Sequence, residues 1–132
     1  VANEAKATIL DETSATLAFA PLDPVSEGHL LGIPKAHSED LFDVPEPVLV
    51  TVMHHAKTIA GRRRARGFDG VKLPNDSGRG AHQSVPHFHL HVALRRDDDE
   101  LDLWPESAYE ERDFEATDEN ARAILGNGDT RR

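Results

Sequence analysis

The chain has 132 residues, which is enough for one compact domain with its own hydrophobic core and too few for two domains of ordinary size. Its 15 Lys and Arg against 24 Asp and Glu give a formal net charge of −9, which argues against nucleic acid or an anionic membrane as a partner held by a general positive field. It has no cysteine, which excludes disulfides and thiolate metal ligands and fits a reducing compartment.

The first residues of the sequence and its hydropathy indicate in which cellular compartment the protein is expected. No run of apolar residues is long enough to cross a membrane, and VANEAKATIL has neither the basic nor the apolar region of a signal peptide. We therefore expect a cytoplasmic protein without a membrane partner. Because the sequence begins with Val1 and soon reaches strand-like residues, it leaves room for native residues before its start.

The first third of the chain has the pattern of β-strands. Apolar and β-branched residues favour strands over Ala7–Leu10, Thr16–Ala20 and His29–Ile33, with turn-rich breaks at Asp11–Ser14 and Pro21–Gly28. Since the connections are short, we expect these strands to be antiparallel neighbours.

A long helix is expected in the middle of the chain, over about Pro47–Arg64. Apolar residues recur there at steps of three and four, which places them on one helix face. They are Leu49, Val52, Met53, Ala56 and Ala60. Proline is tolerated in the first turn, and Gly67 follows the end as a stop signal. The adjacent His54 and His55 cannot share one helix face, so we expect no metal site there.

Four arginines gather at the expected end of this helix. They are Arg62, Arg63, Arg64 and Arg66. The helix dipole favours cations at this end, so a solvated helix terminus is the simpler interpretation of the cluster. A phosphate-binding role is the alternative.

The second half continues the sheet and adds a short helix. We expect a strand at Val71–Leu73, a loop at Pro74–Gly80, a strand over about Pro86–Leu94 and a helix at Thr117–Leu125. The fold class is therefore α+β: one antiparallel sheet, one long helix and a short C-terminal helix, in a single domain over 1–132.

Three histidines alternate with apolar residues near the middle of the second half. His87, His89 and His91 are separated by Phe88 and Leu90. In a strand, side chains two apart point to one face, so the imidazoles share one face and the apolar groups pack in the core. Neighbouring imidazoles disfavour each other's protonation, so part of the set is expected to be neutral. A neutral imidazole with its proton on Nδ1 has a free Nε2 lone pair and is a nucleophile for phosphorus.

Two segments resemble the histidine triad (HIT) superfamily. Gln83–Val92 is similar to the family signature, and Gly28–His37 is similar to its Gly-His-x-Leu-(Val)-Ile-Pro-Lys-x-His segment. Trp104–Pro105 is similar to the Trp-Pro of the Hint-like branch, and the whole resembles bacterial HIT nucleotide hydrolases. The resemblance covers about 15–105 and leaves 106–132 as a C-terminal extension.

The resemblance implies a homodimer that cleaves at the α-phosphate of nucleoside phosphoramidates, phosphate esters or dinucleoside polyphosphates. The reaction would be hydrolysis or nucleotidyl transfer through a nucleotidyl-histidine intermediate, with no metal and no cofactor. By the same resemblance His89 is the nucleophile, His87 orients it, His91 contacts the phosphate and leaving group, and His29 lines the same pocket.

The resemblance also implies a set of nucleotide- and phosphate-binding residues. They are Ser84, Gln83, Asn75, Asp23 and Phe19. Ser84 would contact the phosphate, Gln83 would lie beside the leaving group, and Asn75 would belong to the nucleotide-binding loop. The family places a ribose-binding aspartate two residues after the phenylalanine, where this chain has Pro21, and Asp23 is the candidate replacement.

Two other functions use the same residues. His-x-His on one strand, with His29 as a further ligand, is also typical of zinc-dependent hydrolases. A nucleotide-binding module without catalysis would bind nucleotide and show no turnover. Some bacterial members of the family bind zinc through a cysteine pair and histidines, but no cysteine is present here, so we interpret His37 as structural or exposed.

Overall fold

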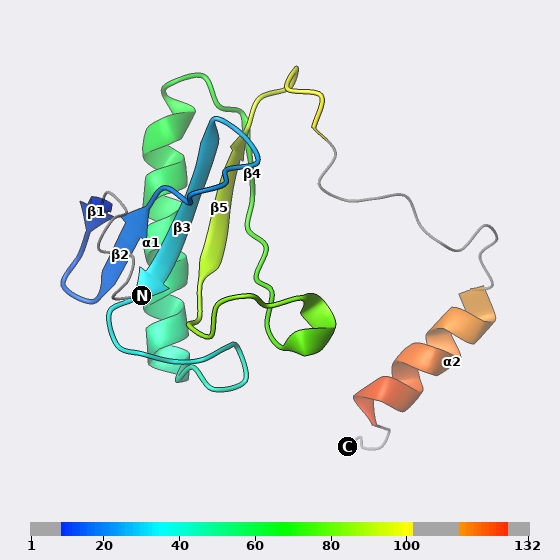
Figure 1. Ribbon diagram of the computed structural model, residues 1–132. Coiled ribbons are helices and arrows are strands. Elements are labelled where there is room, and N and C mark those ends of the chain that lie inside the picture. Colours follow the sequence, from blue (N-terminus) through cyan, green and yellow to red (C-terminus); the bar gives the residue numbers. More distant parts are fainter. Residues whose placement is uncertain (1–8, 102–113, 127–132) are drawn as a thin grey trace. The chain divides into compact units, whose positions relative to one another are not determined.

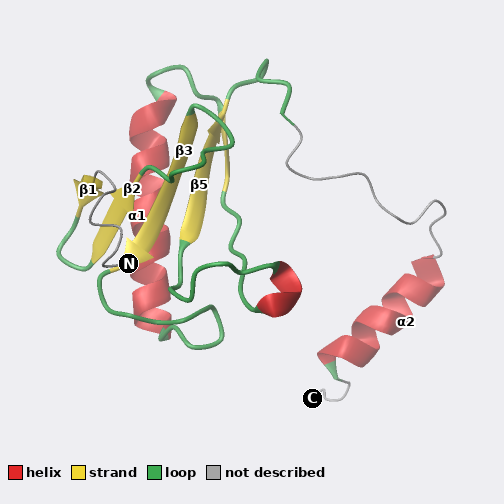
Figure 2. Cartoon of the chain, viewed as in Figure 1, coloured by secondary structure: helices red, strands yellow, loops and turns green. Residues whose placement is uncertain are grey.

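The computed structural model describes residues 9–101 and 114–126 and divides the chain into two compact units, 1–101 and 102–132. The first unit holds an antiparallel sheet and a long helix (Figures 1 and 2). The second unit holds the helix α2 at Phe114–Leu125, which begins three residues before the expected Thr117. A single domain over 1–132 stays a prediction.

The sheet has five strands in the described part of the chain, in the order β1-β2-β3-β5-β4, with every neighbouring pair antiparallel. The strands are β1 (Ile9–Glu12), β2 (Thr16–Phe19), β3 (Gly28–Pro34), β4 (Gly70–Lys72) and β5 (Leu90–Arg95). A short 3₁₀ turn, η2 (Arg79–Ala81), lies in the predicted loop before β5. Because β3 and β5 lie next to each other, His29 and His91 are brought together across 62 residues of sequence.

The helix α1 (Glu46–Arg64) covers one face of the sheet (Figure 1). Leu30 pairs with Val92 in the β3–β5 ladder, and both side chains belong to the core under α1. Successive side chains in a strand alternate, so His29 and His91 point to the opposite face. The core consists of Ala18, Leu30, Val44, Val52, Ala56, Ile59, Phe88, Leu90, Val92 and Leu94.

The buried stripe of α1 differs from the predicted one. Val52 and Ala56 are buried as expected, but Met53 is 43% exposed, and the stripe continues through Ile59 and His55 instead. Which side of α1 is buried depends on how the helix packs across the sheet. The spacing of apolar residues in the sequence does not define that packing direction. None of the described helices is both long and apolar enough to span a membrane.

Strand β1 includes the first two residues of the turn that was expected at Asp11–Ser14, and a polar network holds Asp11 there. Asp11 lies within β1, and its carboxylate accepts hydrogen bonds from His55 Nε2 (2.6 Å) and from both terminal nitrogens of Arg62. These bonds, Arg62's first, lower the pKa of Asp11. His55 is only 3% exposed, and its Nδ1 lies 2.7 Å from Thr16 Oγ1. His55 therefore joins α1 to β1 and β2.

Candidate active site

The histidine segment begins before the strand that was predicted to carry it. β5 starts at Leu90, so only His91 lies within the strand, whereas residues 86–94 were expected to be extended together. The backbone N–H of Phe88 donates to Ser38 O (2.6 Å) and that of His87 to Val85 O (2.8 Å). These bonds replace a sheet ladder at this point. Phe88 itself is 1% exposed and anchors the segment in the core.

His89 is held in the tautomer that a nucleophile needs. Its Nδ1 lies 2.9 Å from the backbone oxygen of His87, which can only accept, so Nδ1 carries the proton. Its Nε2 therefore keeps a free lone pair and has no hydrogen-bond partner among the described residues. Asn75 Nδ2 donates to the backbone oxygen of His89 at 2.8 Å, which fixes the main chain at this position.

His29 and His91 form a second ordered pair. The backbone N–H of Val25 donates to His29 Nδ1 (3.1 Å), so His29 carries its proton on Nε2 and donates it to His91 Nδ1 (2.9 Å). When neutral, His91 therefore has its proton on Nε2. The rings of His89 and His91 lie 5.1 Å apart at 75°. A ring with a free lone pair and a ring with an N–H are thus neighbours, which suits nucleophilic attack with a hydrogen bond donated to the leaving group.

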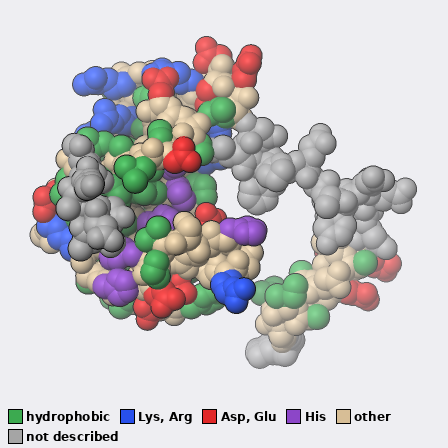
Figure 3. All heavy atoms as spheres, viewed as in Figure 1, with side chains coloured by type: hydrophobic (Ala, Val, Ile, Leu, Met, Phe, Trp, Pro, Cys, Tyr) green, Lys and Arg blue, Asp and Glu red, His purple; other side chains and the backbone are tan. Residues whose placement is uncertain are grey.

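His87 is hydrogen-bonded through its ring to residues outside the group formed by His29, His89 and His91. Its buried ring donates from Nε2 to Pro34 O (3.2 Å), so its Nδ1 is an acceptor for His37 Nδ1 at 3.1 Å. The rings in contact at the centre are those of His29, His91 and His89, whereas His87 supplies the carbonyl that orients His89. Histidine side chains gather on the face shown in Figure 3.

Burial lowers the pKa of three of these histidines. For His29 burial is the cause; for His91 the neighbours His89 and His29 add to burial while Asp76 opposes it. For His87 burial and His37 and His89 lower the pKa, and the bond to Pro34 opposes them. The neutral form of these three imidazoles is therefore favoured.

We expect the NMR titration of His29 and His91 to show midpoints below about 6.5, the value of an unperturbed histidine. A lowered pKa means that the folded protein binds fewer protons than the unfolded chain in this range. The free energy of unfolding should therefore fall as the pH drops below about 6.5. A His29 midpoint at or above that of a histidine in the urea-unfolded chain would contradict the burial of this ring.

Two of the predicted nucleotide-binding residues are engaged within the loop before β5. Asn75 Oδ1 accepts a hydrogen bond from Ser77 while its amide holds His89. Gln83 accepts from the Gly78 N–H (2.7 Å) and donates to the backbone oxygens of Glu39 and Val85. Both side chains therefore shape the loop around the histidines.

The remaining candidates lie around this centre. Ser84 is exposed and makes no hydrogen bond with the described residues. Phe19 is buried in β2 opposite Leu31, which in turn pairs with His91, so the three form a row across the sheet. Asp23 is exposed in the β2–β3 connection, the segment whose Val25 holds His29.

Two residues at the site were missed by the sequence analysis. Asp76 has a carboxylate oxygen 3.8 Å from His91 Nε2, and its position beside Asn75 was the available signal. His37 is exposed, as expected, but it also contacts His87, which no local pattern indicated. The pair Trp104–Pro105 lies outside the described residues.

Solved structures resemble this chain over most of its length. A Zn-bound histidine triad family protein from Mycobacterium smegmatis gives a TM-score of 0.72 at 31% identity, covering 94% of this chain and 87% of that one. A HIT family member from Bacillus subtilis gives 0.75 at 25% identity, covering 94% and 89%. The fold is thus the α+β fold of histidine triad proteins, as the resemblance implied.

The zinc in the mycobacterial protein raises the question of whether the residues here fit a zinc ion. His37 and His87 bring two nitrogens within 3.1 Å, but a zinc site takes at least three protein ligands. No three His, Asp or Glu residues within 9–101 and 114–126 are grouped to hold a metal, and the chain has no cysteine. Both nitrogens of His29 and Nδ1 of His91 are already used in hydrogen bonds. The residues described do not fit zinc, and this donor set does not support a zinc-dependent hydrolase.

Sequence comparisons agree with the structural ones. The adenosine 5′-monophosphoramidase of Saccharomyces cerevisiae is 38% identical over 89 residues, which are 67% of this chain and 54% of the yeast protein. The chain therefore spans about half the length of that relative. A family model of the HIT domain matches residues 2–98. The paired histidines, the fold and this match lead to one conclusion: the chain belongs to the HIT domain family, the histidine triad proteins.

Proposed function

We propose that the protein is a nucleotide hydrolase or nucleotidyltransferase that acts at the α-phosphate of nucleoside phosphoramidates, phosphate esters or dinucleoside polyphosphates. The observation that carries this proposal is the order of the protons at His89 and His91. Nε2 of His89 has a free lone pair and Nε2 of His91 carries a proton, on two rings whose centres lie 5.1 Å apart. The name of the yeast relative places a phosphoramidate first among the substrates to test.

The proposed reaction has two steps at phosphorus. His89 Nε2 forms a bond to the α-phosphorus as the bond to the leaving group breaks, and the His91 Nε2–H donates a hydrogen bond to the departing nitrogen or oxygen, which takes up a proton from water. Water, or another acceptor, then attacks the nucleotidyl-His89 intermediate and releases its proton to the solvent, which leaves His89 neutral as before. The His87 carbonyl stabilises the positive charge that develops on the His89 ring when Nε2 is bonded to phosphorus.

Oxygen atoms of the phosphate need donors in this reaction. Ser84 Oγ is exposed and free of described partners, so it is the donor that we assign to the phosphate. Phe19 and Asp23 are assigned to the nucleoside, because they lie on β2 and on the connection next to His29. Gln83 and Asn75 are assigned to the loop that surrounds the phosphate.

The intermediate is directly testable. The protein is mixed with adenosine 5′-monophosphoramidate, quenched in mild base and examined by intact mass spectrometry and peptide mapping. We expect an added adenylyl group on the peptide that contains His89 and none in the His89→Ala variant. Turnover with no adduct at any time point, or an adduct on another residue, would contradict a His89 nucleophile. Binding without turnover would identify a nucleotide-binding module instead.

We also propose that the protein is a homodimer. An apolar groove runs along α1 and reaches β4, which is an edge strand of the described sheet. Within it Val50 is 66% exposed and Met53 43% exposed, although both are apolar. A second copy that covers this groove would bury these side chains and extend the sheet beyond β4. A cytoplasmic location and the absence of a nucleic-acid partner stay predictions.

The dimer predicts a sharp effect of one charge in the groove. Met53→Asp should convert the dimer to a monomer in light scattering after size exclusion, because an unpaired carboxylate would be buried at the interface. Thr58→Asp places the same charge on an exposed position of α1 outside the groove and should leave the dimer intact. A wild-type protein that is monomeric at high micromolar concentration would refute the proposal.

A further inference from the structure

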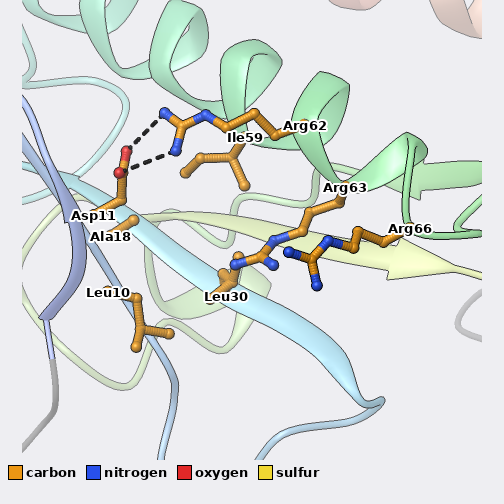
Figure 4. A pocket seen from close by; sticks show the side chains of 8 residues that line it. All are labelled: Leu10, Asp11, Ala18, Leu30, Ile59, Arg62, Arg63 and Arg66. Carbon is orange, nitrogen blue, oxygen red and sulfur yellow. Dashed lines mark hydrogen bonds and ion pairs between the residues drawn. The ribbon is translucent and has the colours of Figure 1, made fainter.

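A second concave site lies away from the histidines, at the C-terminal end of α1. It is a cavity of about 180 Å³ between α1, β1, β2 and β3. Figure 4 shows its lining, which is Leu10, Asp11, Ala18, Leu30, Ile59, Arg62, Arg63 and Arg66. Leu30 points to the face of the sheet that α1 covers, whereas His29 points to the other face. The cavity is therefore separate from the histidine centre.

The charges in this cavity do not balance. Arg62 is paired with Asp11, whose carboxylate also binds His55, so this acid is fully used. Arg63 and Arg66 have no acidic partner in the part of the chain that the structure describes. Both side chains line the cavity, and Figure 4 shows them at the arginine-rich end of α1. Two guanidinium groups that line one cavity and have no acidic partner among the described residues favour an anion there, even in a chain of net charge −9.

The walls of the cavity restrict what the anion can be. Guanidinium forks match phosphate oxygens, and two of them match a group with two negative charges. Leu30, Ala18 and Ile59 give the floor an apolar character that bare phosphate would not use. A cavity of about 180 Å³ suits a phosphoryl group with a few carbon atoms.

We propose that Arg63 and Arg66 bind the phosphoryl group of a small phosphate monoester in the cavity beneath the end of α1. The phosphoryl oxygens accept hydrogen bonds from the two guanidinium groups, and the carbon part of the ligand rests on Leu30 and Ile59. Arg62 forms a fixed wall, because Asp11 holds it. This proposal gives two of the four arginines the phosphate-binding role that was the alternative interpretation of the cluster. The proposed site is independent of the proposed reaction at His89.

The test is site-resolved NMR on the full chain with ethyl phosphate and, in a second series, inorganic phosphate. We expect saturable shifts of the Arg63 and Arg66 Nε–H signals and of the Leu30 and Ile59 methyl groups. Ethyl phosphate should bind about threefold or more tightly than inorganic phosphate, because its carbon atoms reach the apolar floor. The double variant Arg63→Gln/Arg66→Gln should weaken binding by about tenfold or more.

Arg64→Gln is the matched control, since it removes the same charge from the same helix end but does not line this cavity. It should change the affinity by less than about twofold. Equal losses in the control and in the double variant, equal shifts with sodium chloride at the same ionic strength, or phosphate shifts confined to residues 84–91 would each overturn the proposal. The single variant Arg66→Gln alters an exposed residue and gives the same test if the double variant does not fold.

Discussion

Replacement of His89 by alanine is expected to lower kcat on a nucleoside phosphoramidate by about 10⁴-fold or more, because loss of a nucleophile removes the covalent route. The ring is half-buried in the segment just before β5 and makes no hydrogen bond through Nε2 to the described residues, so its loss predicts little change in stability. Steady-state kinetics together with urea unfolding of the same preparation separate the two effects. The free energy of unfolding should stay within about 1 kcal/mol of the wild type.

His54→Ala is the control for this substitution. His54 is exposed on α1 and makes no contact with the histidine centre, so its loss should change kcat by less than about twofold. If His89→Ala retained wild-type kcat, the assignment of the nucleophile would be wrong even though the geometry of His89 and His91 is correct. A fall in kcat that is equal in both variants would point to a shared effect on assembly.

Phe88→Ala should cost about 3–5 kcal/mol of the free energy of unfolding, which is a large part of the 5–15 kcal/mol typical of a domain. The ring is 1% exposed and belongs to the core beneath α1. It also lies between His87 and His89, so the cavity left by alanine would loosen the carbonyl that orients His89. Urea denaturation measures the first effect, and kcat at low temperature measures the second.

Phe42→Ala removes the same side chain from a position that is 84% exposed. Its cost should be below about 0.5 kcal/mol, because no buried apolar contact is lost. Comparable costs for the two phenylalanine variants would show that Phe88 is not a core residue. If the Phe88→Ala protein kept its stability and its activity, the proposal that core packing at Phe88 orients the histidine segment would be contradicted.

Several features of the fold could be predicted from local patterns. The period of α1 and its arginine-rich end indicated a helix over Pro47–Arg64, and the structure begins it one residue earlier at Glu46. The strands β2 and β3 lie within a residue of their predicted limits. Period and turn residues are encoded within a few positions, so sequence reading recovers them. β1 extends past its predicted end at Leu10 to Glu12, because Asp11 is stabilised by His55 and Arg62, which are distant in sequence.

The sequence by itself determined the family, because alternating histidines with a glutamine and a serine before them are typical of one known signature. It also predicted the chemistry, because imidazole is suited to attack phosphorus. Only the tertiary structure decided which nitrogen of each ring carries the proton. That choice depends on Val25, the His87 carbonyl and Pro34, each placed by a different loop or strand. Likewise, the arginines at the end of α1 became a cavity wall only when β1 and β3 were packed beneath them. Hydrogen bonds and cavities between distant segments arise from packing, which no local spacing of residues records.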